Sequence, residues 1–350
     1  MAAAGARPVW TRIEGLPIIG VLLVIVACFM VAAPQVFLGY RIYMSFLATV
    51  PPQLILALGL TLVIAAGEID LSFPSVIAFS GFLFAWCFKT YELTWVALLL
   101  ALAGGALIGF VNGLIIAVLG VPSIIATLAT QFFWGGITTV LTGGLSYSIR
   151  TIDDYAIWDV FVGRIGPVPV QALWGLALAV VLWFVLNRHR FGEHLLFIGD
   201  NPRVAEVVGI NVTREKIRLF TLMGLLGAFA AVLLTMENKN FFNTQGAGYL
   251  LTVIAAVFIG GTSIFGGKAT LVGSFVGAFI IGMIEAGLVA TGIQGFWVRA
   301  VVGLVFLAAV IIHLGVEEPE RRARLRRLFR RRRPRLAAAQ TDQPREAEQP

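Results

Sequence analysis

Residues 199–210 read Gly199-Asp200-Asn201-Pro202-Arg203-Val204-Ala205-Glu206-Val207-Val208-Gly209-Ile210 and lie inside a charged segment, residues 188–218, with apolar stretches on both sides. Asp200 or Asn201 can cap the N-terminus of a helix, because an Asp or Asn side chain accepts hydrogen bonds from the first free backbone amides. Pro202 suits the first turn, where its missing N–H would have no partner within the helix. The stretch therefore predicts a short helix in the middle of a hydrophobic chain.

The predicted helix has an apolar stripe and a defined end. Gly209 ends it, because glycine readily adopts the left-handed conformation that follows many helices. A helix of about two turns is unstable alone in water, so the stripe needs a partner. That partner is either the protein's own bundle or another protein, and the residues leave both open. The stripe consists of Val204, Ala205, Val207 and Val208.

Composition sets the class of the whole chain. Hydrophobic residues make up 59% of the 350 residues and charged residues 13%, and the mean hydropathy is +0.90. Soluble domains carry about 25% charged residues, so a soluble multidomain enzyme is excluded. The fold class expected is all-α, a polytopic membrane helix bundle. Cys28 and Cys87 lie in apolar stretches and the three histidines are scattered, so neither a disulfide framework nor a metal site is expected.

About ten transmembrane helices are expected, since each span needs about 20 apolar residues. They form a permease domain, residues 16–315, between an N-terminal segment, 1–15, and a basic, disordered tail, 316–350. The stretches 73–88 and 249–265 are short for spans. The expected spans are 16–33, 46–66, 73–88, 94–119, 121–143, 170–187, 217–236, 249–265, 270–291 and 297–315.

Basic residues predict the orientation of these spans. They mark the N-terminus, the 188–218 segment and the tail, where ten arginines lie between Arg321 and Arg335. Cytoplasmic loops carry such an excess of Lys and Arg. Six expected spans separate the first two regions and four separate the last two, so all three face the cytoplasm, as do both termini. The tail is expected to contact anionic lipid rather than nucleic acid.

Two further segments then face outward, residues 144–169 and 237–248. The first carries Asp153, Asp154 and Trp158. Either segment could meet an external partner, or both could be plain solvated connections. The sequence does not decide between these two interpretations.

Residues 67–75 place two carboxylates, Glu68 and Asp70, between hydrophobic stretches, followed by Ser72. Charges at membrane depth normally face a cavity or the interior of a bundle. Gly67 and Pro74 bracket the stretch and predict a broken helix, which membranes tolerate where it lines a cavity or is buried in protein. The stretch is interpreted as a gate or structural hinge, and an ordinary cytoplasmic turn is the alternative. No nucleophile accompanies the carboxylates, so no catalytic residue is expected.

A glycine-rich stretch, residues 260–268, resembles a phosphate loop but lacks its pattern. Counting back from Gly267 and Lys268, position 262 is Thr where GxxxxGK[ST] requires glycine. No nucleotide site and no cofactor are therefore expected in this chain. Its glycines are expected to serve a tight turn between close-packed spans. They are Gly260, Gly261, Gly266 and Gly267.

Three polar residues lie inside expected spans. Asn112 lies between Gly109 and Gly113, and an interhelical hydrogen bond is its expected role. Gln131 is interpreted in the same way. Glu285 is ionisable, and an ionisable residue inside a membrane is a candidate for function.

Four ordered motifs resemble the permease subunits of bacterial sugar ABC importers of the ribose/xylose/galactose type. Together they run from about residue 50 to 310. Glu68 stands where that family usually has glycine, and Ala129 replaces the glycine of its TLG motif. The motifs are GEIDLS at 67–72, NG at 112–113 with VPSIIATL at 121–128, GDNPRVAEVVGI at 199–210, and IAAVFIGGTS at 254–263 with FGG at 265–267.

The resemblance implies a ten-helix importer in the bacterial inner membrane that moves a sugar or sugar alcohol by alternating access. It implies a second permease, either a copy or a sister chain, two ATPase subunits docked inside on residues 199–210, and a substrate-binding protein outside. ATP hydrolysis would then take place on the partner chain. The resemblance assigns coupling to Asp200, Asn201, Pro202, Ala205 and Gly209 and the gate or pathway to Glu68, Asp70, Ser72 and Asn112.

Three other functions stay open at this stage. A related importer could carry branched-chain amino acids or nucleosides. An ion-coupled secondary transporter could use Glu68, Asp70 or Glu285 and would need no ATPase. An intramembrane enzyme is disfavoured, because no nucleophile is paired with a base.

Overall fold

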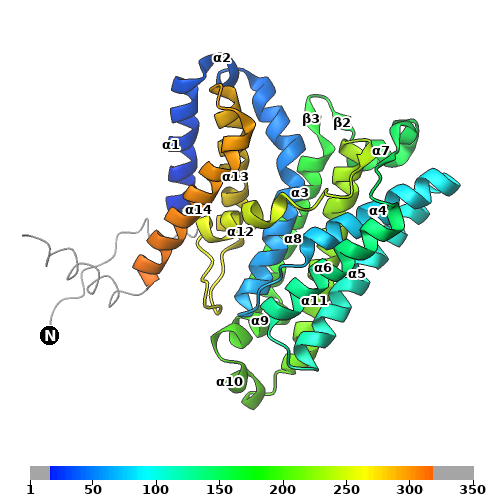
Figure 1. Ribbon diagram of the computed structural model, residues 1–350. Coiled ribbons are helices and arrows are strands. Elements are labelled where there is room, and N and C mark those ends of the chain that lie inside the picture. Colours follow the sequence, from blue (N-terminus) through cyan, green and yellow to red (C-terminus); the bar gives the residue numbers. More distant parts are fainter. Residues whose placement is uncertain (1–15, 318–350) are drawn as a thin grey trace, which may run out of the picture.

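The computed structural model describes residues 16–317 and forms a bundle of long helices (Figure 1). The expected segment 1–15 and the arginine-rich tail from residue 318 lie outside the described residues. The helices are α1 (Leu16–Ala32), α2 (Pro34–Phe37), α3 (Tyr40–Ala65), α4 (Phe73–Tyr91), α5 (Thr94–Ala117), α6 (Ser123–Thr142), α7 (Ala156–Phe161), α8 (Val170–Arg188), α9 (Arg190–Asp200), α10 (Pro202–Val207), α11 (Val212–Glu237), α12 (Tyr249–Ile259), α13 (Leu271–Ala290) and α14 (Gly295–Glu317), with a 3₁₀ helix η2 (Arg150–Asp154). The strands are β1 (Tyr147–Ser148), β2 (Arg164–Ile165), β3 (Val168–Pro169) and β4 (Asn240–Phe241).

Seven of these helices are long and apolar enough to cross a membrane: α3, α4, α5, α6, α8, α11 and α13. They coincide with seven of the ten expected spans. The other three expected spans coincide with the shorter apolar helices of α1, α12 and α14. The predicted helical bundle is therefore confirmed in its coarser form, a mostly helical chain with seven helices able to cross a membrane and four two-residue strands in its connections, whereas ten spans and cytoplasmic termini stay predictions.

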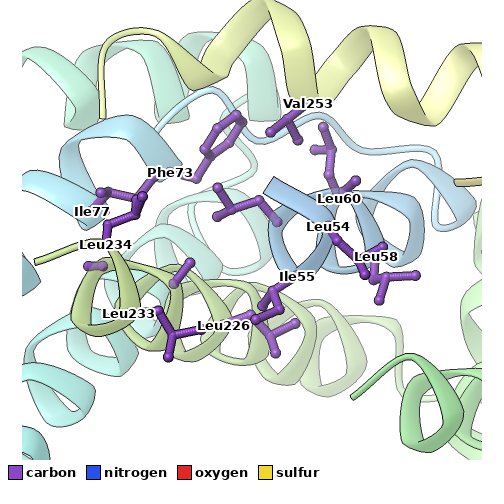
Figure 2. Close-up of a cluster of buried hydrophobic side chains, with 14 of the residues drawn as sticks. Leu54, Ile55, Leu58, Leu60, Phe73, Ile77, Leu226, Leu233, Leu234 and Val253 are labelled. Carbon is purple, nitrogen blue, oxygen red and sulfur yellow. The ribbon is translucent and has the colours of Figure 1, made fainter. Parts of the chain in front are cut away.

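The centre of the bundle is α3, which packs against α8, α11, α12 and α13. From Val50 to Ala66 every residue of this region is buried, because a helix that is apolar all round is stable only when it is surrounded. In Figure 2, Ile55 of α3 lies near Leu226 of α11, whereas Leu54 lies on the other side of α3, where a Cβ on Gly175 of α8 would be 3.3 Å from its Cδ2. The same cluster includes Phe73 and Ile77 of α4 and Val253 of α12.

Helices α5 and α11 pack with their backbones unusually close. Gly105, Gly109 and Gly113 recur every four residues along one face of α5, and a Cβ on any of them would collide with backbone atoms of α11. Gly224 of α11 approaches the backbone of α5 in the same way. Small residues at such spacing let membrane helices approach until their backbones touch, which strengthens van der Waals packing. The two helices form a tightly packed pair on one side of the bundle.

Two helices begin inside the bundle rather than at its end. Val76, in the first turn of α4, lies beside Gly227, which is near the middle of α11. The loop before α12 reaches the same depth, because a Cβ on Gly246 would collide with the carbonyl group of Pro74. The expected span 249–265 is wrong in its extent: α12 ends at Ile259, and Gly261 turns the chain with a φ of +88°.

The two ends of the bundle differ in their connections. Helices α9 and α10 lie together at one end in Figure 1, and α7, β2 and β3 lie at the opposite end. At that opposite end, β1 pairs with β4 in antiparallel register, so the segments 144–169 and 237–248 lie side by side. Lys239 forms an ion pair with Asp153 and lies over the Trp158 ring, 4.9 Å from its centroid.

Candidate functional site

The short helix predicted at residues 199–210 is α10. The Asn201 side chain caps it, because its Oδ1 accepts hydrogen bonds from the backbone N–H of Arg203 at 3.0 Å and of Val204 at 3.2 Å. Pro202 is its first residue. Gly209 follows the helix with a φ of +90°, a conformation that residues with a Cβ rarely adopt. The prediction of cap, first turn and end is confirmed residue by residue.

The apolar side chains of α10 point in two directions. Ala205 is fully buried against Ile198 of α9 and Val212 of α11. Val207 is 87% exposed, and the neighbouring valines, Val204 and Val208, are 50% and 62% exposed. Ala205 therefore seats the helix on its own bundle, while the valines form a separate apolar surface that nothing in the described chain covers. Of the two partners left open by the sequence, the bundle itself covers Ala205, and a second protein on the valines stays a prediction.

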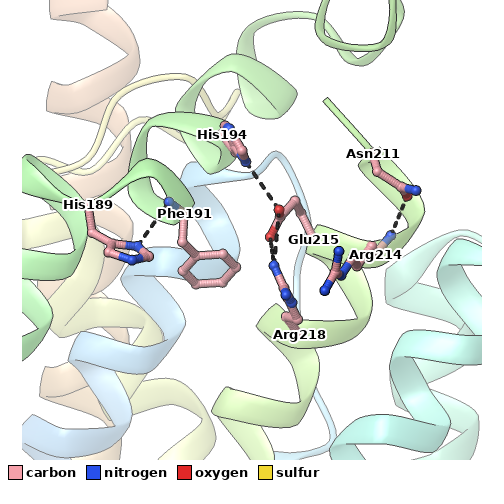
Figure 3. Close-up of polar contacts among 7 residues, drawn as sticks. All are labelled: His189, Phe191, His194, Asn211, Arg214, Glu215 and Arg218. Carbon is pink, nitrogen blue, oxygen red and sulfur yellow. Dashed lines mark hydrogen bonds and ion pairs between the residues drawn. The ribbon is translucent and has the colours of Figure 1, made fainter. Parts of the chain in front are cut away.

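A polar cluster fixes α9 against α11 behind this surface (Figure 3). The Glu215 carboxylate lies 3.1 Å from Nδ1 of His194 and 3.4 Å from Nη1 of Arg218. The Glu215 side chain is only 7% exposed, so these partners stabilise a nearly buried charge. Neither α9 nor this cluster was predicted from the sequence. The signal was present, since Phe191, Leu195 and Ile198 recur at helical spacing.

Three predicted segments meet at the base of α9. The backbone N–H of Gly267 donates to the carbonyl of Ala65 at 3.0 Å. A Cβ on Gly199 would collide with that same carbonyl and would lie 2.6 Å from the amide nitrogen of Gly267. A Cβ on Gly266 would lie 2.9 Å from the carbonyl oxygen of Gly199 and 2.9 Å from Cα of Gly67. The end of α3, the end of α9 and the glycine-rich loop thus touch through their backbones.

The predicted glycine-rich turn divides into two parts. Gly266 and Gly267 take part in the backbone junction and have φ values of +80° and +71°. Gly260 lies instead against α13, where its Cβ would be 2.5 Å from the carbonyl carbon of Gly273. Glu68, next to the junction, forms an ion pair with Lys216 of α11. This pair links the broken-helix segment to the helix that follows α10.

The second carboxylate, Asp70, is held in a buried network. Its Oδ1 accepts hydrogen bonds from the backbone N–H of Ser72 at 2.7 Å and from the Ser72 hydroxyl at 2.6 Å. Asn112 of α5 donates from Nδ2 to the same hydroxyl oxygen at 2.7 Å. None of the three side chains is more than 2% exposed. The structure thus joins the predicted gate residues Asp70, Ser72 and Asn112 in one hydrogen-bond network, which links the segment before α4 to α5. A role of these residues in a pathway stays a prediction.

Helix α6 supplies the remaining partners of this broken segment. The Ser123 hydroxyl oxygen accepts a hydrogen bond from the N–H of Ile69 at 3.1 Å, and Thr127 Oγ1 accepts one from the N–H of Leu71 at 3.0 Å. Backbone groups freed by a break in a membrane helix must be satisfied inside the protein. The segment 66–72 is therefore an ordered part of the fold. The described residues contain no group of three His, Cys, Asp or Glu side chains that could hold a metal ion.

Comparison with known proteins identifies several similar membrane permeases. The family model described as Branched-chain amino acid transport system / permease component matches residues 42–310. The ribose import permease protein RbsC of Escherichia coli strain K12 is 34% identical over 294 residues, which cover 83% of this chain and 91% of that protein. RbsC of Bacillus subtilis strain 168 is 35% identical over 259 residues, covering 74% of this chain and 80% of the relative.

A third relative is the autoinducer 2 import system permease protein LsrC of Klebsiella pneumoniae, which is 32% identical over 265 residues, 74% of each chain. No solved structure matches this chain significantly. The resemblance to sugar-importer permeases, predicted from four motifs, is confirmed by these relatives. Because the family match covers most of the helical region, this chain belongs to the family of branched-chain amino acid transport system permease components and is a membrane transport protein rather than an enzyme.

Proposed function

We propose that this chain is the membrane-spanning subunit of an ATP-driven importer that carries a sugar or sugar alcohol across a bacterial inner membrane. The exposed valines of α10 carry the proposal, because a helix seated through Ala205 with an uncovered apolar surface is suited to dock a separate motor. Relatives named for ribose and autoinducer 2 import favour a small hydroxyl-bearing solute over a branched-chain amino acid.

The proposed complex contains two ATPase subunits, a second permease that is a copy or a sister chain, and a substrate-binding protein. In the proposed topology ten helices cross the membrane and both termini face the cytoplasm, as does α10. The ATPase then shifts the permease between outward- and inward-facing states, because its ATP-bound form binds one of these states better than the other. The opposite end, with β1, β4 and α7, is the proposed surface for the binding protein.

The alternative of an ion-coupled secondary transporter is weakened at two of its three candidate carboxylates, because both are held by partners. Glu68 is paired with Lys216, and Asp70 accepts two hydrogen bonds from Ser72. A proton- or ion-carrying carboxylate must release such partners in each cycle. Uptake that survives ATP depletion but collapses with the ion gradient would favour that alternative.

Purification from the native membrane tests the proposal. We expect an ATPase subunit to co-purify in stoichiometric amount with the wild-type chain. Val207→Asp, which places a charge on the exposed surface of α10, should reduce this association while leaving the permease folded. Val180→Asn, on an exposed face of α8, is the control and should retain the ATPase. A wild-type permease that purifies without any ATPase would contradict the proposal.

The substrate is tested on the partner binding protein. Calorimetric titration with D-ribose, with a sugar alcohol and with leucine separates the sugar importer from an amino acid importer. Binding of a sugar or sugar alcohol, with none of leucine, is the expected result. Tight binding of leucine alone would contradict the proposed sugar substrate and favour an amino acid importer.

A further inference from the structure

Glu285 of α13 lies on the boundary between two cavities. The first, of about 320 Å³, lies between α3, α12 and α13. The second, of about 600 Å³, lies between α12, α13 and α14. Gly248, Thr252 and Glu285 line both, so the two spaces adjoin along the start of α12. Neither cavity belongs to the junction at α9 and α10.

Two polar groups of the first cavity have no partner in the part of the chain that the structure describes. Gln53 of α3 is 4% exposed, and its Nε2 donates no hydrogen bond. The Glu285 carboxylate accepts no hydrogen bond and forms no ion pair among the described residues, although Arg299 lines the second cavity. A buried donor without an acceptor and a carboxylate without a cation both destabilise a bundle. A molecule that fills the cavity and hydrogen-bonds to both groups would remove this cost.

The chemistry of the two groups selects the class of ligand. An ammonium ion would satisfy Glu285 but leave the Gln53 N–H without an acceptor. An anion would accept from Gln53 but would be repelled by Glu285. A hydroxyl group donates one hydrogen bond and accepts others, so a molecule with several hydroxyls can donate to the carboxylate and accept from the amide. Thr49 and Thr252 add two more hydroxyl partners on the same walls.

We propose that the cavity between α3, α12 and α13 binds an uncharged polyhydroxylated solute, with the Glu285 carboxylate as acceptor and Gln53 Nε2 as donor. This inference rests on the proposed function and places a solute site on the transport route within the permease. The broken start of α12 makes the site possible. The chain enters the bundle at Gly246 and leaves Gly248 without any atom close to the position of an added Cβ.

The test measures binding of radiolabelled D-ribose to the full-length chain in lipid nanodiscs by equilibrium dialysis. Glu285→Gln and Gln53→Leu keep the side-chain size and remove the charge or the donor. Each should weaken binding at least about ten-fold, because Gln53→Leu removes a buried donor and Glu285→Gln turns a charge-assisted hydrogen bond into a neutral one. Glu193→Gln, which removes an exposed carboxylate from α9, is the matched control and should bind D-ribose like the wild type.

A third variant guards against misfolding. Gly248→Leu fills the cavity from a position with an ordinary φ of −76° and open space at Cβ, so it should fold and abolish binding. Gly20→Leu, on α1, also has open space at Cβ and should leave binding unchanged. Monodisperse elution and an unchanged melting temperature confirm folding in each case.

Several results would overturn the inference. These are absence of D-ribose binding by the wild type, binding by the three cavity variants equal to that of the wild type, or binding of glucosamine that depends on Glu285 but not on Gln53. ATP-driven uptake by the complete complex is measured in parallel. Sugar uptake that is unchanged in the cavity variants refutes the site and leaves the proposed function standing. A wild-type complex that takes up no sugar refutes the proposed function itself.

Discussion

The two ends of the bundle are held together by different means. At the end that carries α10, the backbones of Ala65, Gly199 and Gly267 touch, with no side chain between them. At the opposite end, the segments 144–169 and 237–248 are joined by a two-residue strand pair and by the ion pair of Lys239 with Asp153, whose side chains are each more than a third exposed.

The contrast between the two ends indicates how each can respond to a partner. Backbone contact leaves no free space, so a displacement of α9 must move the end of α3 and the glycine-rich loop with it. An exposed ion pair and a short strand pair contribute little stability and can rearrange on contact. In the proposed complex, the α10 end would therefore transmit movement of the ATPase, and the opposite end would adapt to the shape of the binding protein.

The largest expected effect comes from placing a side chain at Gly199, where the backbones of α3, α9 and the glycine-rich loop touch. Gly199→Val adds a branched side chain where even one Cβ collides with Ala65 and Gly267. We expect the free energy of unfolding to fall by about 3 kcal/mol or more, because overpacking forces backbone shifts. Little folded protein should be recovered on size-exclusion chromatography. Gly136→Val, on α6 with open space at Cβ, should elute like the wild type. Normal recovery of Gly199→Val would show that the junction is looser than described.

The next effect separates transport from folding. Ala205→Asp buries a carboxylate at a fully buried position of α10, and an unpaired buried charge is strongly unfavourable. Helix α10 should leave its seat while the membrane spans stay inserted. ATP-driven uptake should fall to background with an unchanged amount of protein in the membrane. Ala205→Ser, which keeps the size, should retain most of the uptake. Normal uptake by Ala205→Asp would remove the reason for calling α10 a coupling helix.

A smaller effect is expected in the buried hydrogen-bond network of Asp70, Ser72 and Asn112. Asp70→Ala leaves the N–H and hydroxyl of Ser72 without their acceptor. A buried donor without a partner destabilises by about 1–3 kcal/mol, so the melting temperature in nanodiscs should fall by several degrees. Asp154→Ala is the control, because it removes a carboxylate of η2 at the opposite end of the bundle, outside the network. Equal melting temperatures for the two variants would contradict a stabilising role for the Asp70 network.

The smallest effect is expected at the exposed ion pair, and it depends on pH. The hydrogen bond from Lys239 lowers the pKa of Asp153 below its usual 3.8. The pair therefore stabilises the fold above about pH 4, and the contribution is lost as the pH falls through the lowered pKa. Lys239→Ala should lower the melting temperature slightly at pH 7, progressively less as the pH falls below 3.8, and not at all in 1 M salt, where charges are screened. A difference that persists under both conditions would indicate packing on Trp158 instead.

Local features of the fold could be predicted from the sequence because they depend on neighbouring residues. Asn201, Pro202 and Gly209 set the start and end of α10 by their own chemistry. The break before α4 follows from Gly67 and Pro74. The long apolar stretches each became a helix for the same reason. The interhelical hydrogen bond expected of Asn112 is its contact with Ser72.

Features that depend on distant residues could not be predicted. The meeting of Gly67, Gly199 and Gly266 joins positions up to 199 residues apart, and nothing in the local pattern of any one indicates the other two. The ion pair of Glu68 with Lys216 was missed for the same reason. The division of the α10 stripe into one seated alanine and exposed valines depends on where α9 and α11 lie. Helix α9 was missed because its charges suggested a loop.

Reconstitution into liposomes tests the central claim, that this chain is a passive conduit moved by a separate motor. Solute accumulation is measured with the permease alone, with the permease and its ATPase, and with the complete complex including the binding protein, each with ATP inside the compartment that α10 faces. We expect accumulation against a gradient only when the ATPase is present, and none with Ala205→Asp. Uphill transport by the permease alone would contradict the central claim.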